Sequence, residues 1–381
     1  MTGVPGGSFP AMSSSAVVVG AGVLGSSIAD RLARSGWDVT HVERLAPGHV
    51  RSGSGDESRL MRSSHGGDAL HAQMARRARE LWIELDPRLF VPSGIAWFAH
   101  AADGWEAASE RTLTALGIPV ERVDPADLFP SVNTDDLAFT LYEPEAGILW
   151  ARDGVRALAD RAVAAGARRI TAVARPDGEQ VVLDDGRVLE ADHVIWACGA
   201  WMAELFGDVL DLRITRAEVF YFGGDGSWAT PGVPGWVDFD GAAYGLGDLD
   251  GRGIKVGPDD EGPVVDPTAV ERQATPERLH AARSYLGHRF PALAGAPLVG
   301  NRVCQYEMTA DERFVVAPHP EHGRRVWLVG GGSGHAFKHG PALAERLESW
   351  LTGGEEPEAC FGVGERRREA AMRTAGTRPA G

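Results

Sequence analysis

Gly20, Gly22 and Gly25 have the spacing GxGxxG, and the chemistry that this spacing serves is the binding of a dinucleotide pyrophosphate. The first glycine permits a tight turn, the second lets the backbone approach the phosphates, and the third allows close packing of helix on strand. The phosphates would lie at the positive N-terminus of the following helix. Glu43 ends the next predicted strand, where a carboxylate can accept hydrogen bonds from ribose hydroxyls and disfavours the 2′-phosphate of NADP. Glu43 and its neighbour Arg44 are therefore predicted to bind the cofactor.

Two later segments favour FAD over a nicotinamide dinucleotide, which the glycine spacing alone does not separate. The segment "VLEADHVIWACGAW" (Val188–Trp201) is a polar turn, a strand and a stop of small residues, and it resembles the second fingerprint of many flavoproteins. The segment "VWLVGGGSGHAFKHGPALAERL" (Val326–Leu347) reads as a strand, a glycine-rich turn and a helix. Backbone N–H groups of such a turn, here around Gly332, Gly334 and His335, can face the pyrimidine end of a flavin, where negative charge develops on reduction. FAD is the predicted cofactor.

The elements that must position the first glycines form a compact βαβ unit. Ala16–Val19 is a run typical of a buried strand, and Asp38–Glu43 is the second strand. Between them, Leu24, Ile28 and Leu32 are spaced at i, i+4 and i+8, which predicts a helix with one apolar face.

Two later segments, Gly94–His100 and Arg213–Gly257, contain short β-rich runs separated by Gly, Pro and Asp turns. This pattern indicates a sheet of more antiparallel character. We predict a mixed α/β fold, with a Rossmann-like FAD-binding domain and an inserted antiparallel-sheet substrate domain. The predicted segments are 15–90, 150–212 and 300–360 for the FAD-binding domain, 91–149 and 213–299 for the substrate domain, and 1–14 and 363–381 for disordered tails.

Composition narrows the class of protein. The formal net charge of −15, from 38 basic and 53 acidic residues, argues against a nucleic-acid or anionic-membrane surface. No apolar run approaches the roughly 20 residues of a membrane span. The three widely spaced cysteines, Cys198, Cys304 and Cys360, suit neither a disulfide framework nor a metal site. We predict a cytoplasmic monomer or weak homodimer that binds no nucleic acid, membrane or metal.

With these segments in view, the chain resembles the monomeric sarcosine oxidase and N-methyltryptophan oxidase family, within the D-amino-acid-oxidase-like flavoproteins. The resemblance runs in order from about Val17 to Leu351. The stretches that carry it are "GAGVLGSS", "SGDESRLMR", "YEPEAGILW", "ACGAW", "GRGIKVG", "VCQYEMTADERFVV" and "GSGHAFK".

The resemblance implies three roles beside the flavin. Cys304 matches the cysteine that forms a thioether to the flavin 8α-methyl carbon, Lys255 matches the lysine that activates dioxygen, and Arg59 matches an arginine near the flavin ring. A fixed ammonium would stabilise the superoxide anion that forms when O2 takes up its first electron. In an ungapped register, Gly55 stands where the family has a histidine next to the flavin.

The resemblance also implies a substrate site. Arg62 and Lys338 match the pair that binds the substrate carboxylate, and Tyr244 and Tyr306 match two active-site tyrosines. A guanidinium fork plus a point charge is well suited to a carboxylate. Asp259 stands where the family has a substrate-side histidine, and an acidic residue there suits a cationic or hydroxylated substrate if its side chain faces the pocket.

From residue type alone, several of these residues would be interpreted as ordinary surface or core residues. Without the resemblance, Arg62 reads as a solvated helix charge, Lys255 as an exposed loop lysine and Cys304 as a small core residue. Four further polar residues are read as surface, core, turn or capping positions: His65, His71, Asp56 and Glu57.

We therefore predict an FAD-dependent oxidase of a secondary amino acid, N-methyl or cyclic, that oxidises the C–N bond to an imine and reduces O2 to H2O2. Its partners would be an amino-acid-like small molecule and O2, and its FAD would be covalently bound through Cys304. Three alternatives stay open: a tailoring oxidase of a cyclic or aromatic amino acid in secondary metabolism, a flavin amino-acid dehydrogenase with another electron acceptor, and a flavin-free NAD-binding protein.

Overall fold

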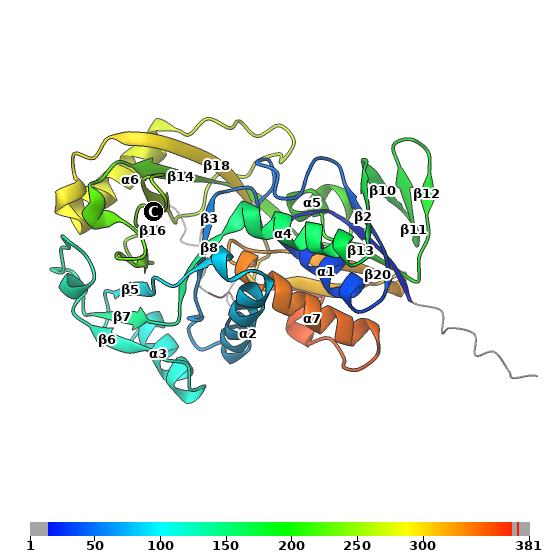
Figure 1. Cartoon of the computed structure of the whole chain (residues 1–381), viewed down its shortest axis with the longest axis horizontal. Coiled ribbons are helices and arrows are strands. Elements are labelled where there is room, and N and C mark those ends of the chain that lie inside the picture. Colours follow the sequence, from blue (N-terminus) through cyan, green and yellow to red (C-terminus); the bar gives the residue numbers. More distant parts are fainter. Residues whose placement is uncertain (1–13, 368–371, 373–381) are drawn as a thin grey trace, which may run out of the picture.

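The computed structural model describes residues 14–367 and Met372. Two parts lie side by side along the long axis, one built on a largely parallel sheet with helices and the other on a large, mostly antiparallel sheet (Figure 1). The predicted mixed α/β class, with a Rossmann-like part and an antiparallel-sheet part, is confirmed.

The first sheet has six strands in the order β19-β20-β13-β1-β2-β9, and all neighbours are parallel except β19 and β20. Its strands are β1 (Ser15–Val19), β2 (Asp38–Glu43), β9 (Arg168–Thr171), β13 (His193–Trp196), β19 (Val315–His319) and β20 (Gly323–Gly330). Helix α1 (Val23–Arg34) connects β1 to β2 and ends just before Gly36, whose φ of 86° suits glycine. The predicted βαβ unit is confirmed.

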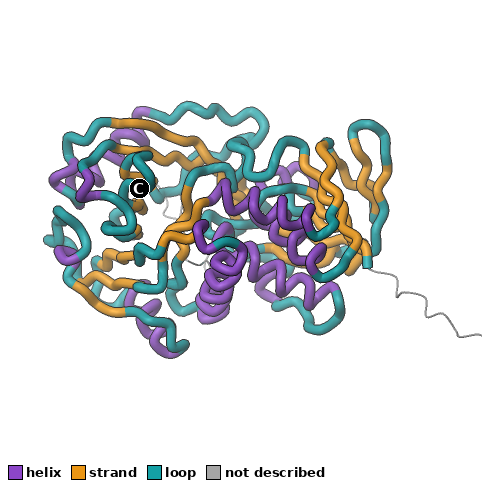
Figure 2. Tube along the Cα trace, in the orientation of Figure 1, coloured by secondary structure: helices purple, strands orange, loops and turns teal. Residues whose placement is uncertain are grey.

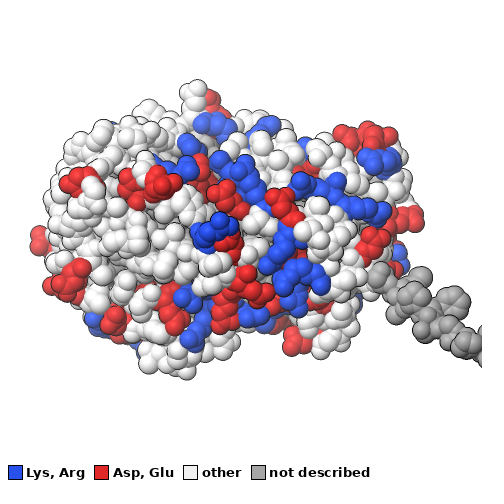
Figure 3. Space-filling view, in the orientation of Figure 1, with Lys and Arg blue, Asp and Glu red and all other residues white. Residues whose placement is uncertain are grey.

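Helices cover one face of this sheet. They are α1, α2 (Ala69–Leu85), α4 (Ala151–Ala164) and α7 (Gly340–Leu351), and α1 packs against both α4 and α7. The apolar stripe of Leu24, Ile28 and Leu32 is buried there, as its spacing predicts. On the outer side, basic and acidic side chains are interspersed (Figure 3), and ion pairs such as Arg31–Glu348 and Arg161–Asp30 join neighbouring helices.

The opposite face of the six-stranded sheet is covered by a smaller group of elements. They are the antiparallel strands β10 (Ala174–Asp177), β11 (Gln180–Leu183) and β12 (Val188–Leu189), together with the short helix α5 (Met202–Leu205). Val181, Leu183 and Met202 pack in one core with Val17 and Trp196.

The second large sheet has eight strands in the order β18-β14-β17-β16-β15-β5-β7-β6, and only β15 and β5 are parallel neighbours among them. Its strands are β5 (Ile95–Ala99), β6 (Glu121–Val123), β7 (Phe139–Glu143), β14 (Arg213–Phe222), β15 (Gly235–Asp238), β16 (Ala243–Leu246), β17 (Ile254–Pro258) and β18 (Leu298–Met308). Helices α3 (Trp105–Ala115) and α6 (Pro276–Arg289) accompany it (Figure 2). Strand β18 belongs to this sheet although it lies within the segment 300–360 that the sequence predicts for the FAD-binding domain.

A small sheet lies where the two parts meet. It consists of β3 (Ser58–Met61), β8 (Gly147–Trp150) and β4 (Phe90–Val91), in the order β3-β8-β4 (Figure 1). Strand β3 carries Arg59 and leads directly to Arg62. This sheet therefore presents two of the predicted site residues at the junction.

The two predicted disordered tails fall largely outside the described residues, which exclude 1–13, 368–371 and 373–381. Within the described part of the second tail, however, Arg366 donates hydrogen bonds to Asp311 Oδ1 (2.7 Å) and to the carbonyl oxygen of Gly362 (2.6 Å). Because an arginine can satisfy a carboxylate and several carbonyl groups at once, Arg366 ties the described start of this segment to Asp311 and Gly362.

Candidate active site

A cavity of about 290 Å³ opens at the carboxyl ends of β1, β2 and β13. The glycine turn lines it, and two of its three glycines are needed there for steric reasons. A Cβ atom on Gly25 would lie 1.8 Å from the carbonyl oxygen of Gly20, and one on Gly20 would lie 2.3 Å from that of Ala197. Gly22 is the N-cap of α1 and adds no side-chain cap, so residues 20–24 present mainly backbone to the cavity. These features fit a bound pyrophosphate.

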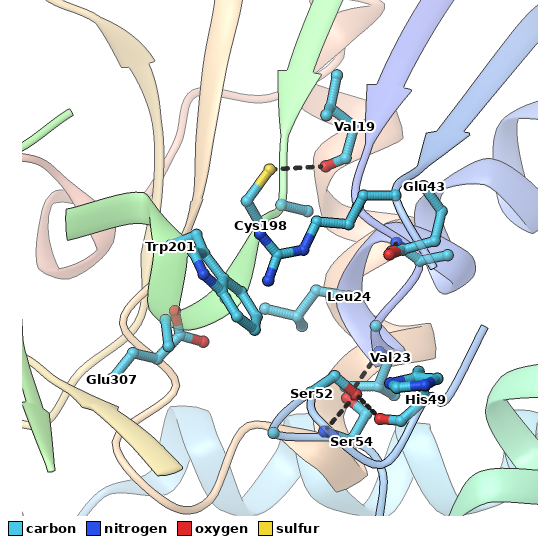
Figure 4. Close-up of a pocket in the computed structure, with 18 of the residues that line it drawn as sticks. Val19, Val23, Leu24, Glu43, His49, Ser52, Ser54, Cys198, Trp201 and Glu307 are labelled. Carbon is cyan, nitrogen blue, oxygen red and sulfur yellow. Dashed lines mark hydrogen bonds between the residues drawn. The ribbon is translucent and has the colours of Figure 1, made fainter. Parts of the chain in front are cut away.

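Glu43 reaches this cavity from the end of β2. Its carboxylate accepts hydrogen bonds from the N–H groups of Ala21 (2.7 Å) and Leu45 (2.9 Å), which fixes its orientation. The Arg44 guanidinium stacks over the Trp201 ring, with 4.0 Å between its central carbon and the ring centroid. Figure 4 shows Glu43, Val23 and Ser54 on one side of the cavity and Trp201 and Glu307 on the other. Carboxylate and aromatic groups so placed suit the ribose and the rings of a dinucleotide.

The late glycine-rich turn lies at the same cavity. Gly332 and Gly334 line it, and Gly334 has a φ of 74° that favours glycine. Glu307 lies against this turn, accepts hydrogen bonds from the N–H groups of Gly331 and Gly332, and leaves its Oε2 atom buried without a partner. Burial raises the pKa of Glu307 to about 7.

A second cavity of about 70 Å³ adjoins the first. Both are lined by Arg59, Tyr306, Gly334 and Phe337. The other residues around the smaller cavity are Leu60, Arg62, Val237, Phe239, Tyr244, Asp259, His335 and Lys338. The structure thus brings all the predicted substrate-side residues, which come from five distant segments of the chain, to one pocket.

Arg62 and Lys338 are both buried at this pocket. Burial, together with Arg62, lowers the pKa of Lys338 well below its ordinary value. Burial also lowers the pKa of Arg62 to about 10, although Glu143 and Asp259 oppose this shift. Burial penalises the positive charge of both groups, and a bound carboxylate would offset that penalty and favour their charged forms, so this pair favours an anionic ligand.

The surroundings of Arg62 hold it in place. Its guanidinium lies over the Trp97 ring, 4.9 Å from the centroid, and donates a hydrogen bond to the carbonyl oxygen of Ser64. Glu143 fixes the same segment by accepting hydrogen bonds from the N–H groups of Ser63 (2.7 Å) and Ser64 (3.1 Å) and from Trp97 Nε1 (2.8 Å).

The two predicted tyrosines face each other in the pocket, with 3.4 Å between their hydroxyl oxygens. Burial is the main cause of the raised pKa values of Tyr244 and Tyr306, so both are neutral donors or acceptors of hydrogen bonds near pH 7. Asp259 is also buried at this wall, and its charge contributes to both shifts.

Lys255 lies deeper than the sequence predicts. It is 2% exposed and lines neither of the two cavities, but a shared carboxylate joins it to the cavity-lining Arg59. That carboxylate belongs to Asp56, which the sequence analysis read as a turn or capping residue. Asp56 Oδ2 accepts hydrogen bonds from Lys255 and from Arg59 (2.8 Å), and its Oδ1 accepts from the Tyr221 hydroxyl (2.9 Å).

Cys304 lies on β18 next to Gln305 and Tyr306, which line the cavities. It is a free thiol and partly exposed. Its sulfur is 4.0 Å from an Arg59 guanidinium nitrogen and 3.8 Å from the carbonyl oxygen of Gly53. The thiol is thus placed beside the larger cavity.

Gly55 explains why this chain lacks a histidine at that position. A Cβ atom on Gly55 would lie 2.2 Å from the carbonyl oxygen of His49, so no larger side chain fits this backbone. His49 itself lines the larger cavity, and the sequence analysis did not single it out.

Next to Arg62 and Lys338 lies a buried cluster of four histidines, His65, His71, His335 and His339, with ring centroids 5.2–5.9 Å apart. His65 Nε2 and His339 Nε2 are 3.3 Å apart. Burial lowers the pKa values of His65, His335 and His339 well below the ordinary value, and Lys338 adds to the shift. One ring nitrogen from each of these three lies within 4.8 Å of the others, a spacing that a metal ion could use, but the neighbouring Lys338 and Arg62 disfavour a cation there.

The fold and the two adjoining cavities define a dinucleotide-dependent oxidoreductase whose substrate pocket opens directly onto the cofactor site. Residues 15–350 match the family of FAD dependent oxidoreductases, and the chain belongs to this family. The cavity fits that cofactor, because its glycine backbone, its ribose-side carboxylate and its late glycine turn are all present.

Named relatives agree with this assignment. The chain is 29% identical to monomeric sarcosine oxidase of Bacillus sp. (strain B-0618), over 89% of this chain and 93% of that protein. It is 26% identical to N-methyl-L-tryptophan oxidase of Yersinia pestis (strain Pestoides F), over 86% and 92% respectively. The predicted family resemblance is confirmed, and the flavin-free alternative is excluded by family membership.

Solved structures share the fold. L-proline dehydrogenase from P. horikoshii aligns with a TM-score of 0.80 at 19% identity, covering 93% of this chain and 98% of the other. NikD, described as an unusual amino acid oxidase essential for nikkomycin biosynthesis, aligns with a TM-score of 0.76 at 21% identity, covering 92% and 98%. Within the described residues, no helix has the length and apolar character required to cross a membrane.

Proposed function

We propose that this protein is an oxidase of a secondary amino acid, N-methyl or cyclic. The observation that carries the proposal is the pocket in which Arg62 and Lys338 face Tyr244, Tyr306 and Asp259 and which shares a wall with the cofactor cavity. FAD held by the two glycine turns and Glu43 would supply the two-electron redox chemistry that links the substrate to O2. The C–N bond loses two electrons and two protons and becomes an imine, while O2 gains two of each and becomes H2O2.

The residues of this chain would bind and orient the substrate. Arg62 can hold both carboxylate oxygens and Lys338 can add a point charge, so the carboxylate end is fixed at one side of the pocket. The neutral tyrosine hydroxyls would meet the substrate nitrogen, and a nitrogen that faces them and not the Asp259 carboxylate favours the unprotonated amine needed for oxidation. Asp259 would select a substrate with a hydroxyl or a second cationic group.

Two roles beside the cofactor are part of the proposal. Lys255 would stabilise the negative charge that oxygen acquires with its first electron, acting through a region of low dielectric constant. Cys304 would hold the flavin covalently through a thioether. Its partly exposed sulfur beside the cavity supports this proposal.

Anaerobic titration with a panel of amino acids tests the substrate class. Secondary amino acids should bleach the visible absorbance of the flavin, whereas the matching amines without a carboxylate should not, because Arg62 and Lys338 then lack their ligand. Bleaching by both groups alike would remove the carboxylate from the recognition scheme. Admission of O2 should then yield one H2O2 per flavin.

Separate variants test the roles of Lys255 and Cys304. Lys255→Met should leave reduction by substrate intact and slow reoxidation by O2. Unchanged reoxidation would favour a dehydrogenase that uses another acceptor. Acid precipitation should leave the flavin attached to the wild-type chain and release it from Cys304→Ser, and release from both would show that the attachment is not covalent.

The tailoring alternative stays open, because an amino acid oxidase essential for nikkomycin biosynthesis shares the fold, and the same panel, extended to cyclic and aromatic amino acids, separates the two. The free and widely spaced cysteines support a proposed site of action in a reducing cytosol.

A further inference from the structure

Asp56 has an unusually complete set of hydrogen-bond partners for a buried carboxylate. Oδ2 accepts from Lys255 and Arg59, and Oδ1 accepts from the Tyr221 hydroxyl and from the N–H group of Glu57 (2.8 Å). Four accepted hydrogen bonds use the full capacity of a carboxylate. Burial alone would raise the pKa of the Asp56 carboxyl, but Lys255 and Arg59 outweigh burial and hold it below its usual range. Asp56 is therefore an anion at neutral pH.

Lys255 depends on this anion. The three hydrogens of its ammonium group have three acceptors, Asp56 Oδ2, the carbonyl oxygen of Ser58 (3.1 Å) and Ser58 Oγ (3.4 Å). Burial lowers the pKa of Lys255, Arg59 lowers it further, and the charge of Asp56 opposes both effects. The charged and titratable groups around Lys255 are Asp56 before β3, Arg59 on β3, Tyr221 on β14, and Arg302 and Cys304 on β18.

The fold brings Tyr221, Lys255 and Asp56 together. Tyr221 and Lys255 are direct cross-strand partners on β14 and β17, so both side chains stand on the same face of the large sheet and reach the same carboxylate. Asp56 arrives from the other side, in the loop that follows the cofactor-lining Ser54. The carboxylate thus joins the sheet that carries Lys255 to the loop that lines the cofactor cavity.

We propose that Asp56 is the counter-ion that keeps Lys255 protonated beside the cofactor and thereby sets the pH range over which the enzyme reduces oxygen. This inference rests on the proposed role of Lys255. Asp56 acts through Lys255 and is a positioning residue. Lys255, Arg59 and Asp56 together carry one net positive charge. Without the Asp56 anion between them, the two buried cations would repel each other and both could not stay charged.

The test uses the flavin-loaded protein and two neutral variants, Asp56→Asn and Asp56→Ser, so that failure of one to fold leaves the other. Asp56→Glu keeps the charge. Glu57→Gln is the matched control, because Glu57 is the adjacent carboxylate but pairs with Arg152, Arg252 and Arg302 instead of Lys255. The first measurement is the visible absorbance of the bound flavin at equilibrium from about pH 6 to about pH 9, and the second is the rate of reoxidation by O2 over the same range.

In the neutral variants we expect the visible absorbance of the flavin to change within this pH range as Lys255 loses its proton. Above the midpoint of that change, the reoxidation rate should fall about tenfold per pH unit. Wild type, Asp56→Glu and Glu57→Gln should show neither. The double variant Asp56→Asn/Lys255→Arg should lose the transition, because a guanidinium stays charged throughout. A wild-type pH profile in the neutral variants, or a loss of rate that is equal at every pH, would overturn the inference.

The two proposals fail in different ways. If Lys255→Met is reoxidised as fast as wild type, the role of Lys255 in oxygen reduction is wrong, yet the spectral transition in Asp56→Asn still reports the ion pair. If Lys255→Met is slow and the neutral Asp56 variants keep the wild-type profile, only the role of Asp56 is wrong.

Discussion

We predict that the buried histidine cluster makes the stability of this protein steeply dependent on pH. Burial lowers the pKa values of His65, His335 and His339 well below the ordinary value near 6.5, so the folded chain holds these rings neutral while the unfolded chain protonates them. The unfolded state then binds more protons, and stability, fully present above about pH 6.5, falls as the pH falls.

The magnitude follows from proton linkage. Once the unfolded chain is protonated, each such ring lowers the free energy of unfolding by about 1.4 kcal/mol for every pH unit of acidification. Three rings together therefore lower it by about 4 kcal/mol per pH unit below about pH 6. His41 adds to this slope, because burial lowers its pKa to about 4. Asp56 and Asp68 have lowered pKa values too, but an unfolded aspartate near 3.9 is still ionised in this range, so they contribute only under more acidic conditions.

Denaturant unfolding followed by tryptophan fluorescence at about pH 7.5, 6.5 and 5.5 measures this slope. His339→Phe, which keeps a ring of similar size in the cluster, should reduce the slope by about 1.4 kcal/mol per pH unit, whereas the same change at the exposed His280 should not. A wild-type slope that His339→Phe leaves unaltered would refute the assignment of neutral buried rings.

Three further outcomes are expected. Gly25→Ala should destabilise the chain by about 1–3 kcal/mol and lower its flavin content, measured by unfolding and by visible absorbance, since its methyl group would meet the Gly20 carbonyl oxygen. Arg62→Lys should lower kcat/KM for a carboxylate substrate about 30-fold, the equivalent of about 2 kcal/mol for one lost charge-assisted hydrogen bond, and an unchanged flavin content, measured by visible absorbance, serves as the control. Glu307→Gln should raise the Tm more at about pH 8.5 than at about pH 6, because burial raises the pKa of Glu307 to about 7 and the native state loses stability until Glu307 is ionised above that pH.

Local patterns made much of the fold predictable. The βαβ unit depends on glycines whose neighbours in space are also near in sequence, as with Gly25 and Gly20, and on apolar spacing that one helix face must bury. The family resemblance, rather than residue type, identified Arg62, Lys338, Tyr244, Tyr306 and Asp259, which the structure brings to one pocket.

The missed residues act through partners that are remote in sequence. Asp56 and Lys255 are 199 positions apart, and His65 and His339 are 274 apart, so neither pairing leaves a local pattern. Asp56 was also ambiguous by type, because an aspartate after glycine commonly belongs to a turn. Only the pairing of β14 with β17 shows that Tyr221 and Lys255 reach the same point.

For protein engineering, the residues that line both cavities must be distinguished from those that line only the smaller one. Arg59, Tyr306, Gly334 and Phe337 touch both spaces, so a change at any of them alters the flavin environment together with the substrate fit. Leu60, Val237 and Phe239 line the smaller cavity but not the larger one. A library aimed at new substrates should therefore vary these apolar positions first, since they offer changes in pocket shape that leave the redox centre as it is.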